Sequence, residues 1–285
     1  MERGALSASD HDWSQPHPIE DLAHICYTQG QYDQAEAYFR QALALAEHQH
    51  DPPGQTMARI LNRLGMICKY QGRYDTAIDC YQHALVLLLP HVGSEHPDVA
   101  AIFHNLGGIE HARGQYSRGI PLAQWAVTLR ERALGSDHLA VAADKAALAA
   151  LLEGQRQYGQ AEGLYQEVIA VYERHFGPEY HELGVIFNNL ASIAYARHDE
   201  GLAERLYQRA LAIKERHLVP THPDIAVTLN NLAVLYKNQG RYDCAKPLFQ
   251  RARAIFIARL GPNHPNVIAF QGNYERFLAA LDCPE

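Results

Sequence analysis

Apolar residues between positions 223 and 261 recur at intervals of three and four, the period of an amphipathic helix. They fall into two groups on either side of Gly240: Ile225, Leu229, Leu232, Leu235 and Tyr236, then Ala245, Leu248, Phe249, Ala252, Ile255 and Phe256. Gly240 suits the left-handed conformation that ends a helix, and Gly261-Pro262 ends the second group. The pattern therefore predicts an antiparallel helix pair that must stack on other pairs to bury its apolar faces.

The same pattern returns every 42 residues, which predicts a repeat protein. A Gly-x-Tyr turn recurs at Gly30, Gly72, Gly114 and Gly240, and Arg156 and His198 occupy the same place in two other repeats. A histidine before the first helix recurs in step at positions 96, 138, 222 and 264, and an asparagine within that helix at 105, 189, 231 and 273. We predict repeats at residues 18–54, 55–96, 97–138, 139–180, 181–222 and 223–264.

The ends of the chain differ from the repeats. Residues 1–17 lack the pattern and are predicted to be a flexible segment, and residues 265–285 are predicted to be a capping helix and tail. The fourth repeat is poorest in the repeated residues, because Ala146 and Ala147 replace its asparagines and Arg156 its glycine. We therefore expect the fourth repeat to be a weak joint.

These residues resemble the tetratricopeptide repeat, with Leu232, Ala233 and Tyr236 in the first helix and Gly240 and Tyr242 in the turn. The 42-residue period, NNLAVLY and LGPNHPNV are similar to the kinesin light chain subtype, and the resemblance covers residues 18–281. It implies an all-α, right-handed superhelical solenoid whose first helices line a concave groove. It also implies a non-catalytic scaffold for protein–protein interaction, with peptides bound along that groove.

Candidate binding residues are those of the first helices that face the expected groove. They are Arg59, Asn62, Arg63, Lys69, His104, Asn105, His111, Asn188, Asn189, Asn230, Asn231 and Lys237. Asparagine amides both donate and accept hydrogen bonds, so a column of them can bind an extended peptide backbone, or can instead join neighbouring helices. Basic side chains outnumber Glu153 on this face, which suggests an acidic peptide or a C-terminal carboxylate as the ligand.

Composition narrows the partner class. The chain is 47% hydrophobic with a formal net charge of -7, so no electrostatic feature favours nucleic acid or an anionic membrane. It has no apolar run long enough to cross a bilayer and no secretory signal at its start, so we expect a cytoplasmic protein. No nucleotide-binding, serine-hydrolase or zinc-protease motif occurs, and we expect no cofactor and no enzymatic activity.

The cysteines and histidines are expected to have structural roles. Five cysteines without a CxxC pair predict free thiols, and Cys26 and Cys68, at equivalent places in successive repeats, should lie too far apart for a disulfide. The histidines that recur every 42 residues are expected to cap helices rather than bind metal. His48 and His50 are expected to lie in a solvated loop.

Two other functions stay open. The chain could be a self-associating regulatory or assembly subunit that uses its second-helix faces, with Tyr32, Tyr74, Tyr116 and Trp125 as contact residues. It could also hold a small ligand or a catalytic site in the divergent third and fourth repeats, where His104, Glu110 and His111 come near Glu153 and where Gly119 and Pro121 break the second-helix pattern. A third possibility is that the N-terminal segment of the chain itself fills the groove.

Overall fold

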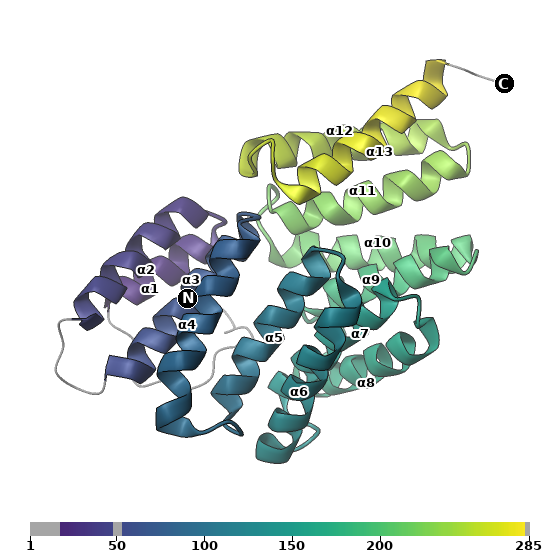
Figure 1. Ribbon diagram of the computed structural model, residues 1–285. Helices are drawn as coiled ribbons and strands as arrows, with labels where there is room; N and C mark the ends of the chain where they lie inside the picture. The colour runs from purple at the N-terminus through teal and green to yellow at the C-terminus, as the bar shows by residue number, and fades with distance from the viewer. Residues whose placement is uncertain (1–17, 48–52, 283–285) are drawn as a thin grey trace. The chain divides into compact units, whose positions relative to one another are not determined.

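The computed structural model describes residues 18–47 and 53–282 (Figure 1). This described part of the chain contains thirteen helices and no strand, which confirms the all-α prediction. The helices are α1 Pro18–Thr28, α2 Tyr32–Glu47, α3 Pro53–Tyr70, α4 Tyr74–Val92, α5 Pro97–Ala112, α6 Tyr116–Leu134, α7 Leu139–Gly154, α8 Tyr158–Phe176, α9 Leu183–Ala196, α10 Glu200–His217, α11 Pro223–Asn238, α12 Tyr242–Arg259 and α13 Pro265–Asp282. The predicted flexible segment 1–17, His48, His50 and Cys283 lie outside the described residues.

Small residues let the two helices of a pair approach closely. In the α3–α4 pair, Ala77 and Ala84 are fully buried, and Tyr81 packs over Gly65. A Cβ atom on Gly65 would lie 2.6 Å from the Tyr81 ring, so only glycine fits there. The apolar face predicted from the three- and four-residue spacing is therefore the face that packs within the pair.

The turn between paired helices keeps one backbone conformation even where its glycine is lost. Gly72 and Gly240 have φ angles of 76° and 72°, and the non-glycine residues Arg156 and His198 have φ angles of 62° and 64°. The left-handed conformation strains a residue with a Cβ atom. The packing of the two helices therefore imposes the turn, and the glycine only makes it less costly.

The recurring histidines cap the first helices, as predicted. His96, His138 and His222 accept a hydrogen bond through Nδ1 from the backbone amide two residues later, at 3.2, 3.1 and 3.2 Å, and begin α5, α7 and α11. His264 makes the same contact with Asn266 at 3.1 Å. The side chain satisfies a helix amide that has no partner inside the helix.

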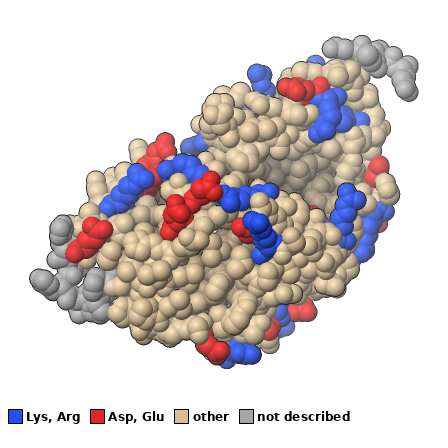
Figure 2. Space-filling view, in the orientation of Figure 1, with Lys and Arg blue, Asp and Glu red and all other residues tan. Residues whose placement is uncertain are grey.

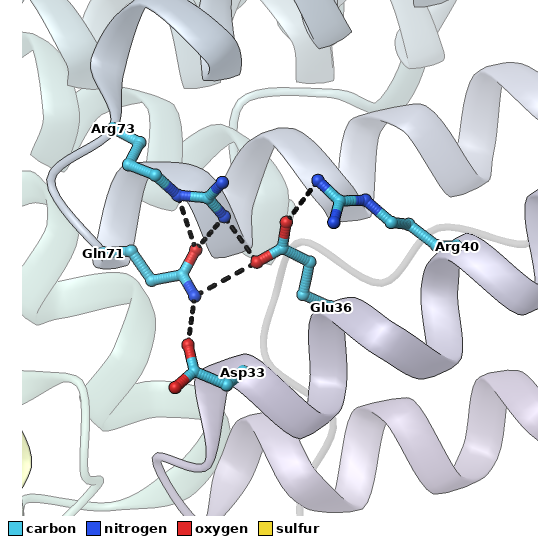
Figure 3. A network of polar contacts seen from close by, with 5 residues as sticks. All are labelled: Asp33, Glu36, Arg40, Gln71 and Arg73. Atoms are coloured by element: carbon cyan, nitrogen blue, oxygen red, sulfur yellow. Dashed lines mark hydrogen bonds and ion pairs between the residues drawn. The ribbon is translucent and has the colours of Figure 1, made fainter.

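Side chains at the turns link successive pairs. Figure 3 shows Asp33, Glu36 and Arg40 of α2 with Gln71 and Arg73 of the α3–α4 turn. Gln71 Nε2 donates to Asp33 at 2.7 Å and to Glu36 at 3.2 Å, and Arg73 pairs with Glu36. Arg40 reaches the other oxygen of Glu36 at 2.6 Å. These contacts hold the first pair of helices to the second.

Contacts divide the chain into two compact units, Met1–Val171 and Tyr172–Glu285. The boundary lies within α8, the second helix of the predicted fourth repeat. In the second unit α13 packs on α11 and α12, and its Phe270 and Phe277 join Phe249 and Phe256 in a buried aromatic cluster. None of the described helices is long and apolar enough to span a membrane.

Candidate functional site

All candidate binding residues lie on first helices of the pairs. Arg59, Asn62, Arg63 and Lys69 belong to α3, His104, Asn105 and His111 to α5, Asn188 and Asn189 to α9, and Asn230, Asn231 and Lys237 to α11. The described surface mixes both signs of charge, and acidic and basic side chains lie close to one another on the face shown in Figure 2. Whether a charged side chain is free to bind a ligand therefore depends on the hydrogen bonds and ion pairs that it makes within the protein.

The asparagines join neighbouring first helices. The amide of Asn105 donates to Asn62 at 2.8 Å, and equivalent bonds join Asn231 to Asn188 at 3.3 Å and Asn273 to Asn230 at 3.2 Å. Of the two roles that the sequence left open, contact between helices is the one present in the structure. Each amide has further donor or acceptor capacity, so a ligand contact is compatible with these bonds.

Arg59 is used inside the protein. It is 8% exposed and donates through Nη1 and Nη2 to Glu20 of α1, which is 5% exposed, with 2.8 Å between Nη2 and Oε1. This bidentate pair joins α1 to α3. Arg63 is half-buried and also interacts with other residues of the protein. We therefore leave both arginines out of the proposed site.

Lys69 differs from these arginines because its ammonium has no hydrogen-bond or ion-pair partner among the described residues. It is half-buried and reaches from α3 to α5, where a Cβ atom on Gly108 would lie 2.6 Å from Nζ. Burial lowers the pKa of Lys69. Gly108 thus makes room for a charge that nothing in the described part of the chain neutralises.

His111 lies one turn after Gly108 on α5 and interacts with the same ammonium. The ring is exposed to solvent, yet the surrounding protein lowers the pKa of His111, and repulsion by Lys69 lowers it further. Both groups are electrostatically stabilised by a negative charge placed between them. This part of α3 and α5 therefore carries two basic groups that a negative charge between them would stabilise.

His104 is held by a buried ion pair that the sequence did not reveal. Its Nδ1 lies 2.8 Å from Asp144 Oδ1 of α7, and Arg130 Nη1 of α6 lies 2.9 Å from the same oxygen. Arg130 also donates to the Ala140 carbonyl at 3.3 Å. Asp144 is fully buried and Arg130 is 1% exposed. The sequence contained one signal for this ion pair. The residues 42 positions earlier, Leu88 and Ile102, are apolar, so Arg130 and Asp144 place charges at positions that are apolar in the preceding repeat.

The residues suggested for a catalytic site do not share one face of α5. Glu110 faces α6, where its Cβ would lie 3.2 Å from a Cβ on Gly119, whereas His104 contacts Asp144 of α7. Burial raises the pKa of Glu153 to about 7, and the Tyr165 hydroxyl donates to its carboxylate at 3.4 Å. The glycine at 119 that interrupts the sequence pattern serves packing, because a Cβ there would lie 2.4 Å from Leu151.

The aromatic residues considered for self-association are placed unequally. Tyr32 is buried, Tyr74 and Tyr116 are half-buried, and Trp125 is 54% exposed beside Phe103. Trp125 is therefore the member of this set that is best placed to meet a second copy.

The structure contains no cluster of three or more metal-ligating side chains within residues 18–47 and 53–282.

The family models and the solved structures that match this chain indicate the same fold. Family models described as Tetratricopeptide repeat match residues 18–89, 98–174 and 145–216, and residues 225–266. No curated protein matches the sequence. The structure is similar to BtubC (BKLC) from P. vanneervenii, with 23% identity, a TM-score of 0.59 and coverage of 80% of this chain and 91% of that chain.

Two further structures share the architecture. A Rap protein complexed with competence and sporulation factor matches with 16% identity and a TM-score of 0.66, covering 92% of this chain and 81% of that chain. A putative kinesin light chain from Podosopora anserina with nearly identical TPR-like repeats matches with 23% identity and a TM-score of 0.51, covering 73% of this chain and 97% of that chain. At these identities the likeness establishes the helical repeat fold.

Proposed function

Because the chain belongs to the tetratricopeptide repeat family, we propose that it is a scaffold that binds an acidic segment of another protein along its first helices. Repeats of this family generally mediate protein–protein interaction. In this proposal the six repeats predicted at residues 18–264 supply the surface, and Lys69 with Gly108 and His111 supplies its anchor for a carboxylate.

The uncompensated ammonium of Lys69 is the observation that carries this proposal. A half-buried charge without a partner among the described residues costs free energy in the unbound protein. A carboxylate from a ligand removes that cost and forms a charge-assisted hydrogen bond. The same contact adds electrostatic attraction to His111 when its imidazole is protonated.

Asparagines on both units support the proposal in a second way. The bonds between Asn62 and Asn105 and between Asn188 and Asn231 fix the spacing of neighbouring first helices. Amide groups that are already oriented lose little side-chain entropy when they bind a peptide backbone. In the second unit Lys237 is half-buried near the end of α11 and is proposed as a further contact for acidic residues.

The test measures binding of a fluorescein-labelled peptide rich in Asp and Glu by anisotropy, with the matching Asn and Gln peptide as a control. We expect the acidic peptide alone to bind, with an affinity that falls as salt is raised. Lys69→Gln should weaken binding about tenfold, which corresponds to one charge-assisted hydrogen bond of about 1.4 kcal/mol. Gly108→Ala should also weaken binding, because the added methyl group displaces the ammonium.

The matched control is Lys246→Gln, which removes the same charge from an exposed position on α12. This variant should bind the acidic peptide like the native protein. Equal losses in the Lys69 and Lys246 variants would show that only net charge matters. Equal binding of the uncharged peptide would refute the acidic-ligand proposal.

A further inference from the structure

A groove lies between α12 and α13, which are neighbours in the second unit (Figure 1). Its volume is about 340 Å³. The buried rings of Phe256 on α12 and Phe270 on α13, whose centroids are 5.4 Å apart, form part of its lining. Arg253 lines it from α12 and Glu275 from α13. The groove therefore combines an apolar lining with one charge of each sign.

Exposed apolar side chains surround this groove. Ala226 of α11 is fully buried, whereas Ile268, which lies 42 residues later on α13, is 56% exposed. Ile268 is one turn before Gln271, which lines the groove, and Leu278 on the same face of α13 is also exposed. Ile257 of α12 lines the groove and is 67% exposed. Apolar side chains that gather beside one groove indicate a surface that contacts another molecule.

The two charged residues of the groove are exposed and do not pair with each other. Glu275 makes no hydrogen bond or ion pair with any residue in the described part of the chain. The guanidinium of Arg253 lies 6.0 Å from the centroid of the Tyr274 ring and has no acidic partner among residues 18–47 and 53–282. An acid and a base are thus both available to a molecule that enters the groove.

This surface is complementary to itself, which favours a second copy of the chain as its occupant. In a twofold dimer every contact between two different residues occurs twice, once in each direction. Arg253 of each copy then meets Glu275 of the other, and both charges are neutralised. A ligand that carries charge of only one sign would leave either Arg253 or Glu275 unpaired. The apolar Ile257 beside each groove supplies a side chain that fits the groove of the other copy.

We propose that the α12–α13 groove is a twofold interface between two copies of this chain. Arg253 of each copy pairs with Glu275 of the other, and Ile257 of each copy enters the opposite groove. The proposal is independent of peptide binding, because Lys69 and His111 belong to the first unit and the groove belongs to the second.

Sedimentation velocity of the full chain across a wide concentration series is the first test. We expect a monomer–dimer equilibrium, in which the mean sedimentation coefficient rises with protein concentration. Added salt should weaken the dimer, because it screens the two exposed ion pairs. A sedimentation coefficient that stays at the monomer value at every concentration overturns the proposal.

Charge reversal then tests the predicted pairing. Arg253→Glu and Glu275→Arg each place like charges opposite one another at both contacts, so each should raise the dimer dissociation constant about tenfold or more. An equimolar mixture of these two variants should associate as the native protein does, because every mixed dimer again has opposite charges at both contacts. The proposal is overturned if both single variants dimerise like the native protein, or if the mixture fails to associate.

Matched variants at other exposed positions are the controls. Lys246→Glu reverses a charge on α12 outside the groove and should leave the dissociation constant unchanged. Ile257→Ser should weaken the dimer about tenfold or more, whereas Val86→Ser, at a position on α4 that is 68% exposed, should not. Far-UV circular dichroism verifies that each variant is folded. A dimer lost in Trp125→Ser and kept in Ile257→Ser would place the interface on α6 and overturn the proposal.

Discussion

Replacing Arg130 with leucine tests how much the buried ion pair with Asp144 contributes to the free energy of unfolding. Asp144 is fully buried, and Arg130 at 2.9 Å is its cationic partner in the core. Arg130→Leu leaves that carboxylate in the core with only His104 at 2.8 Å. Removing one partner of a buried ion pair typically costs about 3–5 kcal/mol, because the remaining charge is desolvated without compensation. We expect a loss of this size in the free energy of unfolding.

The chain itself supplies the matched control. The residues 42 positions earlier, Leu88 and Ile102, occupy the same places in the preceding repeat and are both fully buried. The double variant Arg130→Leu, Asp144→Ile copies this apolar pair into the α6–α7 contact. Exchanging a buried ion pair for apolar residues of similar volume is often neutral or stabilising. The double variant should therefore lie within about 1–2 kcal/mol of the native protein.

These variants form a double-mutant cycle of the native protein, Arg130→Leu, Asp144→Ile and the double variant. Urea denaturation followed by far-UV circular dichroism measures the free energy of unfolding of each. Hydrogen exchange of α6 and α7 then shows whether the change is local. A coupling energy of at least about 3 kcal/mol is expected from the single and double variants. A single variant that costs less than about 1 kcal/mol, or additive losses in the double variant, would refute this account of the pair.

Three further predictions concern stability. Arg156→Gly should stabilise the protein by about 1 kcal/mol in urea denaturation, because the φ angle of 62° strains a residue with a Cβ atom, and Arg156→Ala should give no such gain. Asn231→Ala should lower the free energy of unfolding by about 1 kcal/mol by removing its bond to Asn188, and an unchanged free energy of unfolding would contradict a stabilising role for this contact. Burial raises the pKa of Glu153 from 4.5 to about 7, so the folded state holds this proton more tightly and stability should fall as pH rises between these values. In Glu153→Gln the decline in the free energy of unfolding over this pH range should be smaller by about 2–3 kcal/mol. A variant with the same pH dependence of stability as the native protein would show that Glu153 titrates normally.

Local features of the chain were predictable because they depend on neighbours in sequence. The three- and four-residue spacing predicted the helices, the glycine and histidine positions predicted the turns and caps, and the 42-residue period predicted the order of first and second helices. The helix expected at Pro265–Leu281 runs from Pro265 to Asp282. Even the turn at Arg156, where the motif is lost, follows the period, since packing of the paired helices sets its backbone.

The candidate site was predictable only as a set of positions. Sequence spacing places Arg59 and Lys69 on one helix, but the structure gives Arg59 a carboxylate from α1 and leaves Lys69 without a partner among the described residues. Likewise, the pairing of Asn62 with Asn105 is a contact between repeats that spacing alone leaves as one of two options.

The sequence by itself therefore determined the type, number and order of the helices in the described chain, since those follow from short-range periodicity. The tertiary structure decided which polar side chains are neutralised, as in the contact of Arg130 with Asp144, and which amides pair across helices, as in Asn62 and Asn105. The reason is physical: partners are chosen by the reach of side chains across packed helices, and a change of a few ångströms decides whether a charge is paired, buried alone or left for a ligand.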